Sequence, residues 1–149
     1  MRRAVFVASV GLAFFAGCGV ARWLPHANAA EGMTAQIVHV PELAGDALGP
    51  ASATGLRSKT FASADGMTIS VQAGNTPKHL HPNTNEMQYI VEGTGTIWLG
   101  EKEVRVQPGD LVIIPKGTPH GGTKPDSGVF KAIAIKTPPQ APNDMTLLP

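Results

Sequence analysis

Apolar and polar residues alternate in short runs along most of the chain after residue 30. The alternation is clearest at Met67, Ile69 and Val71, and no long window keeps the 3.6-residue spacing of an amphipathic helix. Short apolar runs bounded by turn-forming residues predict strands at residues 56–61, 67–71, 79–81, 86–91, 96–99, 104–107, 111–114 and 129–135. A further β-prone run at residues 37–40 ends at Pro41. The pattern therefore predicts an all-β fold, either a sandwich or a barrel.

This pattern divides the chain into four parts. Residues 1–29 are predicted to be an export signal peptide, residues 30–55 an N-terminal segment, residues 56–136 the β-barrel, and residues 137–149 a Pro-rich C-terminal tail. The prolines at positions 138, 139, 142 and 149 should keep the tail extended and out of a central ladder.

Composition narrows the class of protein. The chain has 149 residues, of which 42% are hydrophobic and 15% charged, so we expect one compact domain. Seventeen glycines and thirteen prolines favour many turns over long helices. The formal net charge is only +1 and the basic residues are dispersed, so the sequence predicts no nucleic-acid partner.

The first 29 residues have the layout of an export signal. Arg2 and Arg3 precede an apolar stretch at residues 4–17, and residues 27–29 (Ala-Asn-Ala) form a small-x-small cleavage site. We therefore predict an exported protein, periplasmic after cleavage. Two alternatives attach it to the membrane: lipidation of Cys18, whose surroundings loosely resemble a lipobox, or retention of the uncleaved signal. Cys18 is the only cysteine, so the domain should contain no disulfide.

Three histidines and a glutamate form the most specific chemical pattern. His79 and His81 are two residues apart, which on a strand places both imidazoles on the same side. Glu86 follows a turn-rich segment, and His120 follows another such segment after residues 111–114. Three imidazoles and a carboxylate suit one divalent transition metal, with Mn, Fe, Ni, Cu and Zn all open. The alternative is that these side chains only hydrogen-bond one another.

These residues carry a resemblance to the cupins, a superfamily of small jelly-roll barrels also described as double-stranded β-helices. The first cupin motif is matched by Gly74, His79-x-His81, Glu86 and Gly93, and the second by Gly109, residues 115–117 (Pro-Lys-Gly) and His120. Gly74 is one residue closer to the first histidine than usual. Lys124 stands where the family often has Asn, which puts any local role of that Asn in doubt. The resemblance implies that His79, His81, Glu86 and His120 bind one metal inside the barrel and leave coordination positions open.

Other residues are weaker candidates. Gln88 shares strand parity with Glu86, so it either faces the same cavity and touches a substrate or lies at the surface. Trp98 is a candidate for the pocket wall, although a lone strand tryptophan is commonly a core residue. The run Leu111-Val112-Ile113-Ile114 is apolar on both faces, so residues 35–55 or a second subunit should cover its outer side. We expect a homodimer.

Function is left open by the fold, because cupins support many activities. The leading hypothesis is a metal-dependent enzyme, of oxygenase or lyase type, that acts on a small polar molecule. The alternative is an exported, non-catalytic protein that binds a metal or a small ligand with the same four residues. A third hypothesis, a structural partner in an envelope complex, depends only on the apolar outer strand.

Overall fold

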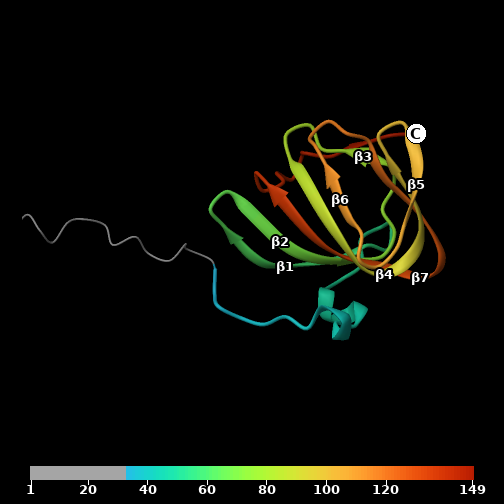
Figure 1. Ribbon diagram of the computed structural model, residues 1–149. Coiled ribbons are helices and arrows are strands. Elements are labelled where there is room, and N and C mark those ends of the chain that lie inside the picture. Colours follow the sequence, from blue (N-terminus) through green and yellow to red (C-terminus); the bar gives the residue numbers. More distant parts are fainter. Residues whose placement is uncertain (1–32) are drawn as a thin grey trace, which may run out of the picture.

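The computed structural model describes residues 33–149, in which antiparallel strands curl around a common interior (Figure 1). Two short 3-10 helices, η1 (Val40–Glu42) and η2 (Gly45–Leu48), precede the strands. The strands are β1 (Arg57–Ala64), β2 (Met67–Ala73), β3 (His79–Leu80), β4 (Asn85–Leu99), β5 (Lys102–Val106), β6 (Leu111–Ile114), β7 (His120–Thr137) and β8 (Thr146–Leu147). The predicted signal peptide, with Cys18, lies outside the described residues. Between residues 33 and 149, no helix has the length and hydropathy needed to cross a membrane.

The long strands β4 and β7 organise the sheet. They pair with each other over most of their length, and each of the two strands runs through both halves of the fold. In one half, β6 pairs with the start of β4. The last part of β7 pairs with β2, and β2 in turn pairs with β1. In the other half, β5 pairs with the end of β4, and β3 pairs with the start of β7 and with β8. This arrangement confirms the predicted all-β, jelly-roll fold.

A bend at Gly93 lets β4 serve both halves of the fold. The sequence predicted two strands separated by a turn at residues 92–93, but the structure has one continuous strand with register shifts around this position. Gly93 has φ +88°, and a Cβ there would lie 2.9 Å from the Cα of Phe130 on β7. Only glycine combines that backbone conformation with so close an approach. The predicted turn was therefore wrong, because the glycine bends a strand and does not end it.

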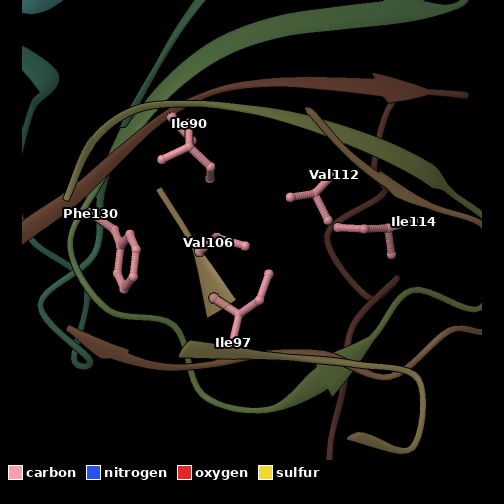
Figure 2. Close-up of a cluster of buried hydrophobic side chains, with 7 residues drawn as sticks. Ile90, Ile97, Val106, Val112, Ile114 and Phe130 are labelled. Atoms are coloured by element: carbon pink, nitrogen blue, oxygen red, sulfur yellow. The ribbon is translucent and has the colours of Figure 1, made fainter. Parts of the chain in front are cut away.

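The main hydrophobic core fills the interior between the two halves, as Figure 2 shows. It consists of buried aliphatic and aromatic side chains from β4, β5, β6 and β7: Ile90, Ile97, Val106, Val112, Ile114, Phe130 and Ala132. On β6 the alternation is sharp, because Val112 and Ile114 are buried whereas Leu111 and Ile113 are 61% and 63% exposed. Burial of each large apolar side chain stabilises the fold by about 1.5–3 kcal/mol.

The N-terminal segment covers β2 and leaves the outer side of β6 exposed. Leu48 is completely buried against Val71 and Ala73 of β2, with Val40 and Phe61 beside them. The predicted strand at residues 37–40 is wrong: a 3-10 helix begins at Val40, and Pro41, which cannot donate a ladder hydrogen bond, occupies its second position. The segment thus builds a second, smaller core.

The C-terminal tail returns to the end of the barrel that carries β3. Its short strand β8 pairs with β3 at the sheet edge, so the prolines do not prevent this contact. The backbone N–H of Leu148 also donates to the carbonyl of Lys78, at 2.9 Å. The tail therefore lies beside the two histidines of β3 and its following turn.

Candidate metal centre

The four side chains predicted as ligands come together at this end of the barrel. His79 lies in β3 and pairs across the sheet with His120, the first residue of β7. His81 directly follows β3, and Glu86 is near the start of β4. One ligand atom from each residue lies within 4.8 Å of the others, and all four residues are at most 4% exposed. The donor set can therefore surround a single cation.

Each imidazole is held through its Nδ1 atom by a main-chain carbonyl. His79 Nδ1 lies 2.7 Å from the oxygen of Pro77, His120 Nδ1 2.9 Å from that of Thr118, and His81 Nδ1 2.5 Å from that of Asp144. A carbonyl oxygen only accepts, so Nδ1 must carry the hydrogen and donate. In the neutral ring, Nε2 is then an unprotonated donor atom for a metal.

Glu86 completes the centre with a carboxylate. Its Oε2 lies 3.2 Å from His81 Nε2 and 3.3 Å from His120 Nε2, and its Oε1 accepts a hydrogen bond of 2.9 Å from Gln88 Nε2. Both Glu86 Oε2 and His120 Nε2 are buried without a hydrogen-bond partner. Lone pairs that face an anion at this distance need a positive charge between them, so the residues fit a divalent cation.

Protonation states at neutral pH suit the same role. Burial lowers the pKa of His79 from 6.5 to about 4, so this imidazole stays neutral. Burial alone would raise the pKa of Glu86, but contacts with His120, His81 and Lys136 outweigh it and hold that pKa well below its usual value. Glu86 is consequently ionised. Metal binding at this centre requires a neutral imidazole and a charged carboxylate.

A cavity of about 300 Å³ opens beside the centre. His79, Glu86 and Gln88 line it, so the structure places Gln88 both in the cavity wall and against the carboxylate of Glu86. Trp98 is not among the lining residues: its ring lies under the ammonium group of Lys78, with 4.0 Å from Nζ to the ring centroid. Substrate contacts by Gln88 and Trp98 stay predictions.

Two residues at the centre were missed from the sequence. Lys136 is 9% exposed, lines the cavity, and its Nζ lies 3.7 Å from Glu86 Oε2. Strand parity could have found it, since Lys136 is two residues from Ala134, whose side chain is fully buried. Asp144 gave no local signal, because it reaches His81 from the tail, 63 residues away.

Sequence comparison matches part of the chain to a known domain family. A family described as "Cupin domain" matches residues 67–136, which include all four candidate ligands. The "Uncharacterized protein MJ1618" of Methanocaldococcus jannaschii is 31% identical over 70 residues, or 47% of this chain. Those residues correspond to 56% of that relative's length, so the match spans a little over half of it.

Solved structures share the fold. An uncharacterized conserved protein of Klebsiella pneumoniae with a double-stranded β-helix domain is 16% identical, with a TM-score of 0.59 over 78% of this chain and 99% of that chain. A variant of Streptomyces PAC13 solved with uridine is 17% identical, with a TM-score of 0.56 over 66% of this chain and 82% of that chain. At these identities the likeness concerns the arrangement of strands.

Proposed function

Because residues 67–136 match the cupin domain family, we propose that His79, His81, Glu86 and His120 hold one divalent transition metal and that the protein is a metal-dependent enzyme. The reaction would be of oxygenase or lyase type, on a small polar molecule. One observation carries the proposal: three imidazoles, each fixed through Nδ1 by a main-chain carbonyl, group around a buried carboxylate, and Nε2 of both His81 and His120 faces Oε2 of Glu86. Ring orientation by such contacts is a regular feature of metal-binding histidines.

The chain's own residues would prepare the site for its substrate. Gln88 holds the free carboxylate oxygen of Glu86, which leaves Oε2 directed at His81 and His120. The cavity adjoins the ligands and limits the substrate to a small molecule. A bound divalent metal would supply Lewis acidity to a carbonyl, carboxylate or hydroxyl group placed there.

A protein of similar fold supplies one class of small polar molecule to test. The Streptomyces PAC13 variant was solved with uridine, and Pac13 is described as a nucleoside dehydratase, which is a lyase-type activity. The identity of 17% transfers neither the substrate nor the reaction, so nucleosides are one class to test among several.

The test combines metal analysis with an activity screen. Protein purified from its native compartment should contain about one metal ion per chain by elemental analysis. Metal-loaded protein is then screened for oxygen uptake and for loss of small acids, catechols and nucleosides. Turnover that disappears with chelation supports an enzyme. A full metal content without turnover, together with ligand-induced shifts in the metal spectrum, would establish the non-catalytic binding protein, and the absence of metal would refute the centre itself.

We also propose that the protein is exported to the periplasm and forms a homodimer. Residues 1–29 support export through their composition, and mass spectrometry of the mature chain tests it: a start at Ala30 supports cleavage, and a lipidated start at Cys18 supports a lipoprotein. The exposed apolar side chains of Leu111 and Ile113 support a subunit contact over β6. Light scattering at micromolar concentration should give twice the mass of the mature chain.

A further inference from the structure

The cavity beside the metal centre contains a buried lysine that the proposed metal chemistry does not use. We propose that Lys136 anchors a negatively charged group of the substrate, so that the molecule bound here is a small organic carboxylate with an apolar body. This inference rests on the proposed function, because the carboxylate would bind between the metal centre and Lys136.

Lys136 lies within the site and is held there. It is on β7, and its Nζ is 3.5 Å from His81 Nε2 and 3.7 Å from Glu86 Oε2. The ammonium group also donates to the side-chain oxygen of Gln140 in the tail. Lys136 is 9% exposed and lines the same cavity as His79 and Gln88. A ligand in the cavity therefore meets both the centre and this ammonium group.

The charges of the cavity lack an anion once a metal is bound. Glu86 is the only carboxylate among the residues that line the cavity. When it binds a dication, it can no longer balance Lys136 as well. Three neutral imidazoles, one carboxylate, a dication and an ammonium group sum to a net charge of +2. The buried carboxylate of Asp144 is bound to Asn83 and does not line the cavity. Burial of unbalanced charge is costly, and a bound carboxylate offsets it.

The remaining wall of the cavity describes the rest of the ligand. Leu56, Pro77, Met145 and Leu147 give it a largely apolar surface, and the polar contribution comes from Gln72 and the short hydroxyl side chains of Ser52, Thr54 and Thr76. An apolar wall favours a hydrocarbon body behind the charged group. The chemistry of the cavity thus fits a short aliphatic or small cyclic carboxylate better than a polyhydroxylated molecule.

A second buried lysine on the same strand provides a contrast. Lys131 is 7% exposed, but its Nζ lies 2.7 Å from Glu92 Oε2 and 3.2 Å from the carbonyl oxygen of Pro41. These partners are independent of the metal centre, and Lys131 fastens the N-terminal segment to the barrel. Lys131→Met therefore serves as a matched control for Lys136→Met.

The experiment measures ligand binding by the full chain loaded with cobalt(II), whose visible absorption reports ligands at the centre. Butyrate and its neutral isostere butyramide are titrated into wild type, Lys136→Met, Lys136→Arg and Lys131→Met. We expect wild type and Lys131→Met to bind butyrate at least tenfold more tightly than butyramide. In Lys136→Met the Kd for butyrate should rise at least tenfold with little change for butyramide, and Lys136→Arg should restore much of the butyrate affinity. Lys136→Met should also bind cobalt more tightly than wild type, because it removes a like charge beside the centre.

The outcomes separate this inference from the proposed function. Failure of wild type to take up cobalt would overturn both. Cobalt uptake with equal affinity for butyrate and butyramide would overturn only the carboxylate inference, and the wild-type comparison decides this even if Lys136→Met fails to fold. Equal butyrate affinity in wild type and Lys136→Met would show that Lys136 serves only as a partner of Glu86, which also refutes the anchor role.

Discussion

The contact between Glu86 and Lys136 gives the sharpest test of how the centre is held together. We consider Glu86→Gln, Lys136→Met and the double variant, all studied with a chelator so that no metal contributes. Each substitution keeps a side chain of similar size and removes one charge. Each single variant leaves the other charge buried without its oppositely charged partner, whereas the double variant removes both charges. The coupling energy of this cycle therefore measures the charge pair.

The distance between the two charged groups sets the size of the expected coupling energy. Two unit charges 3.7 Å apart interact by about 4.5 kcal/mol at an effective dielectric constant of about 20. The two side chains are only 2% and 11% exposed, so solvent screens this pair weakly. Loss of one partner of a buried pair costs about 3–5 kcal/mol. After relaxation of the site, we expect a coupling energy of about 2–4 kcal/mol, with the double variant more stable than the sum of the single effects predicts.

The assay is denaturant unfolding at pH 7 followed by circular dichroism. The control is the same cycle on Arg105 and Asp126, whose groups are 2.5 Å apart but 64% and 49% exposed. Exposed pairs contribute under about 1 kcal/mol despite good geometry. A coupling for Glu86 and Lys136 below about 0.5 kcal/mol, equal to that of the control pair, would refute the claim that burial makes this contact strong.

Further predictions concern metal binding, stability at acidic pH and the oligomeric state. His81→Ala should lower the metal content sharply by elemental analysis, whereas His39→Ala, at an exposed position, should not; full metal retention in His81→Ala would refute the ligand set. Burial lowers the pKa of His79 to about 4, so the unfolded chain gains a proton below about pH 6.5 that the folded chain does not, and the Tm of chelated protein should fall from pH 6.5 to 4. A Tm that is flat over this range would contradict the buried, neutral imidazole. Deletion of residues 138–149 removes a carbonyl that orients a ligand and should weaken metal binding about 10–100-fold by competition with a chromophoric chelator; unchanged affinity would show that the tail is dispensable. Ile113→Lys should convert a dimer to a monomer in light scattering, and an unchanged dimer would place the interface elsewhere.

The sequence predicted the elements whose pattern is local. Strand β6 lies at the predicted residues 111–114, and β2 begins at the predicted Met67. Which face of β6 is buried was not predicted, because residues 111–114 are apolar on both faces; the structure buries Val112 and Ile114. The grouping of the four candidate ligands was also predictable, since turns with Gly and Pro bring the ends of neighbouring strands together.

Prediction failed where glycine and proline act within a strand. Residues 120–128 contain Gly121, Gly122, Pro125 and Gly128 and were left outside the predicted strands, yet β7 begins at His120 and pairs with β4 through this region. Register shifts between the two strands accommodate these residues. Glycine and proline end a strand, as local propensity predicts, only when pairing with a neighbouring strand does not hold the chain extended.

Contacts made by the N-terminal segment and the C-terminal tail could not be predicted from the sequence either. The packing of Leu48 against β2 and the contact of Asp144 with His81 join segments that are far apart in the sequence. Neither segment has a periodic pattern, so only the folded arrangement shows what they touch. Lys136 was only partly predictable. Its strand parity indicates an inward-facing side chain, but lysine is usually exposed, which argues against a position in the barrel interior.

The imidazoles of the centre are oriented by oxygens that every amino acid possesses. The carbonyls of Pro77, Thr118 and Asp144 hold the three rings, so these contacts impose no residue type at positions 77, 118 and 144. An alignment of relatives would reveal the histidines but not the main-chain carbonyls that orient them. Transplanting this centre into another scaffold would thus mean copying three stretches of backbone, since four grafted side chains would arrive without their supports.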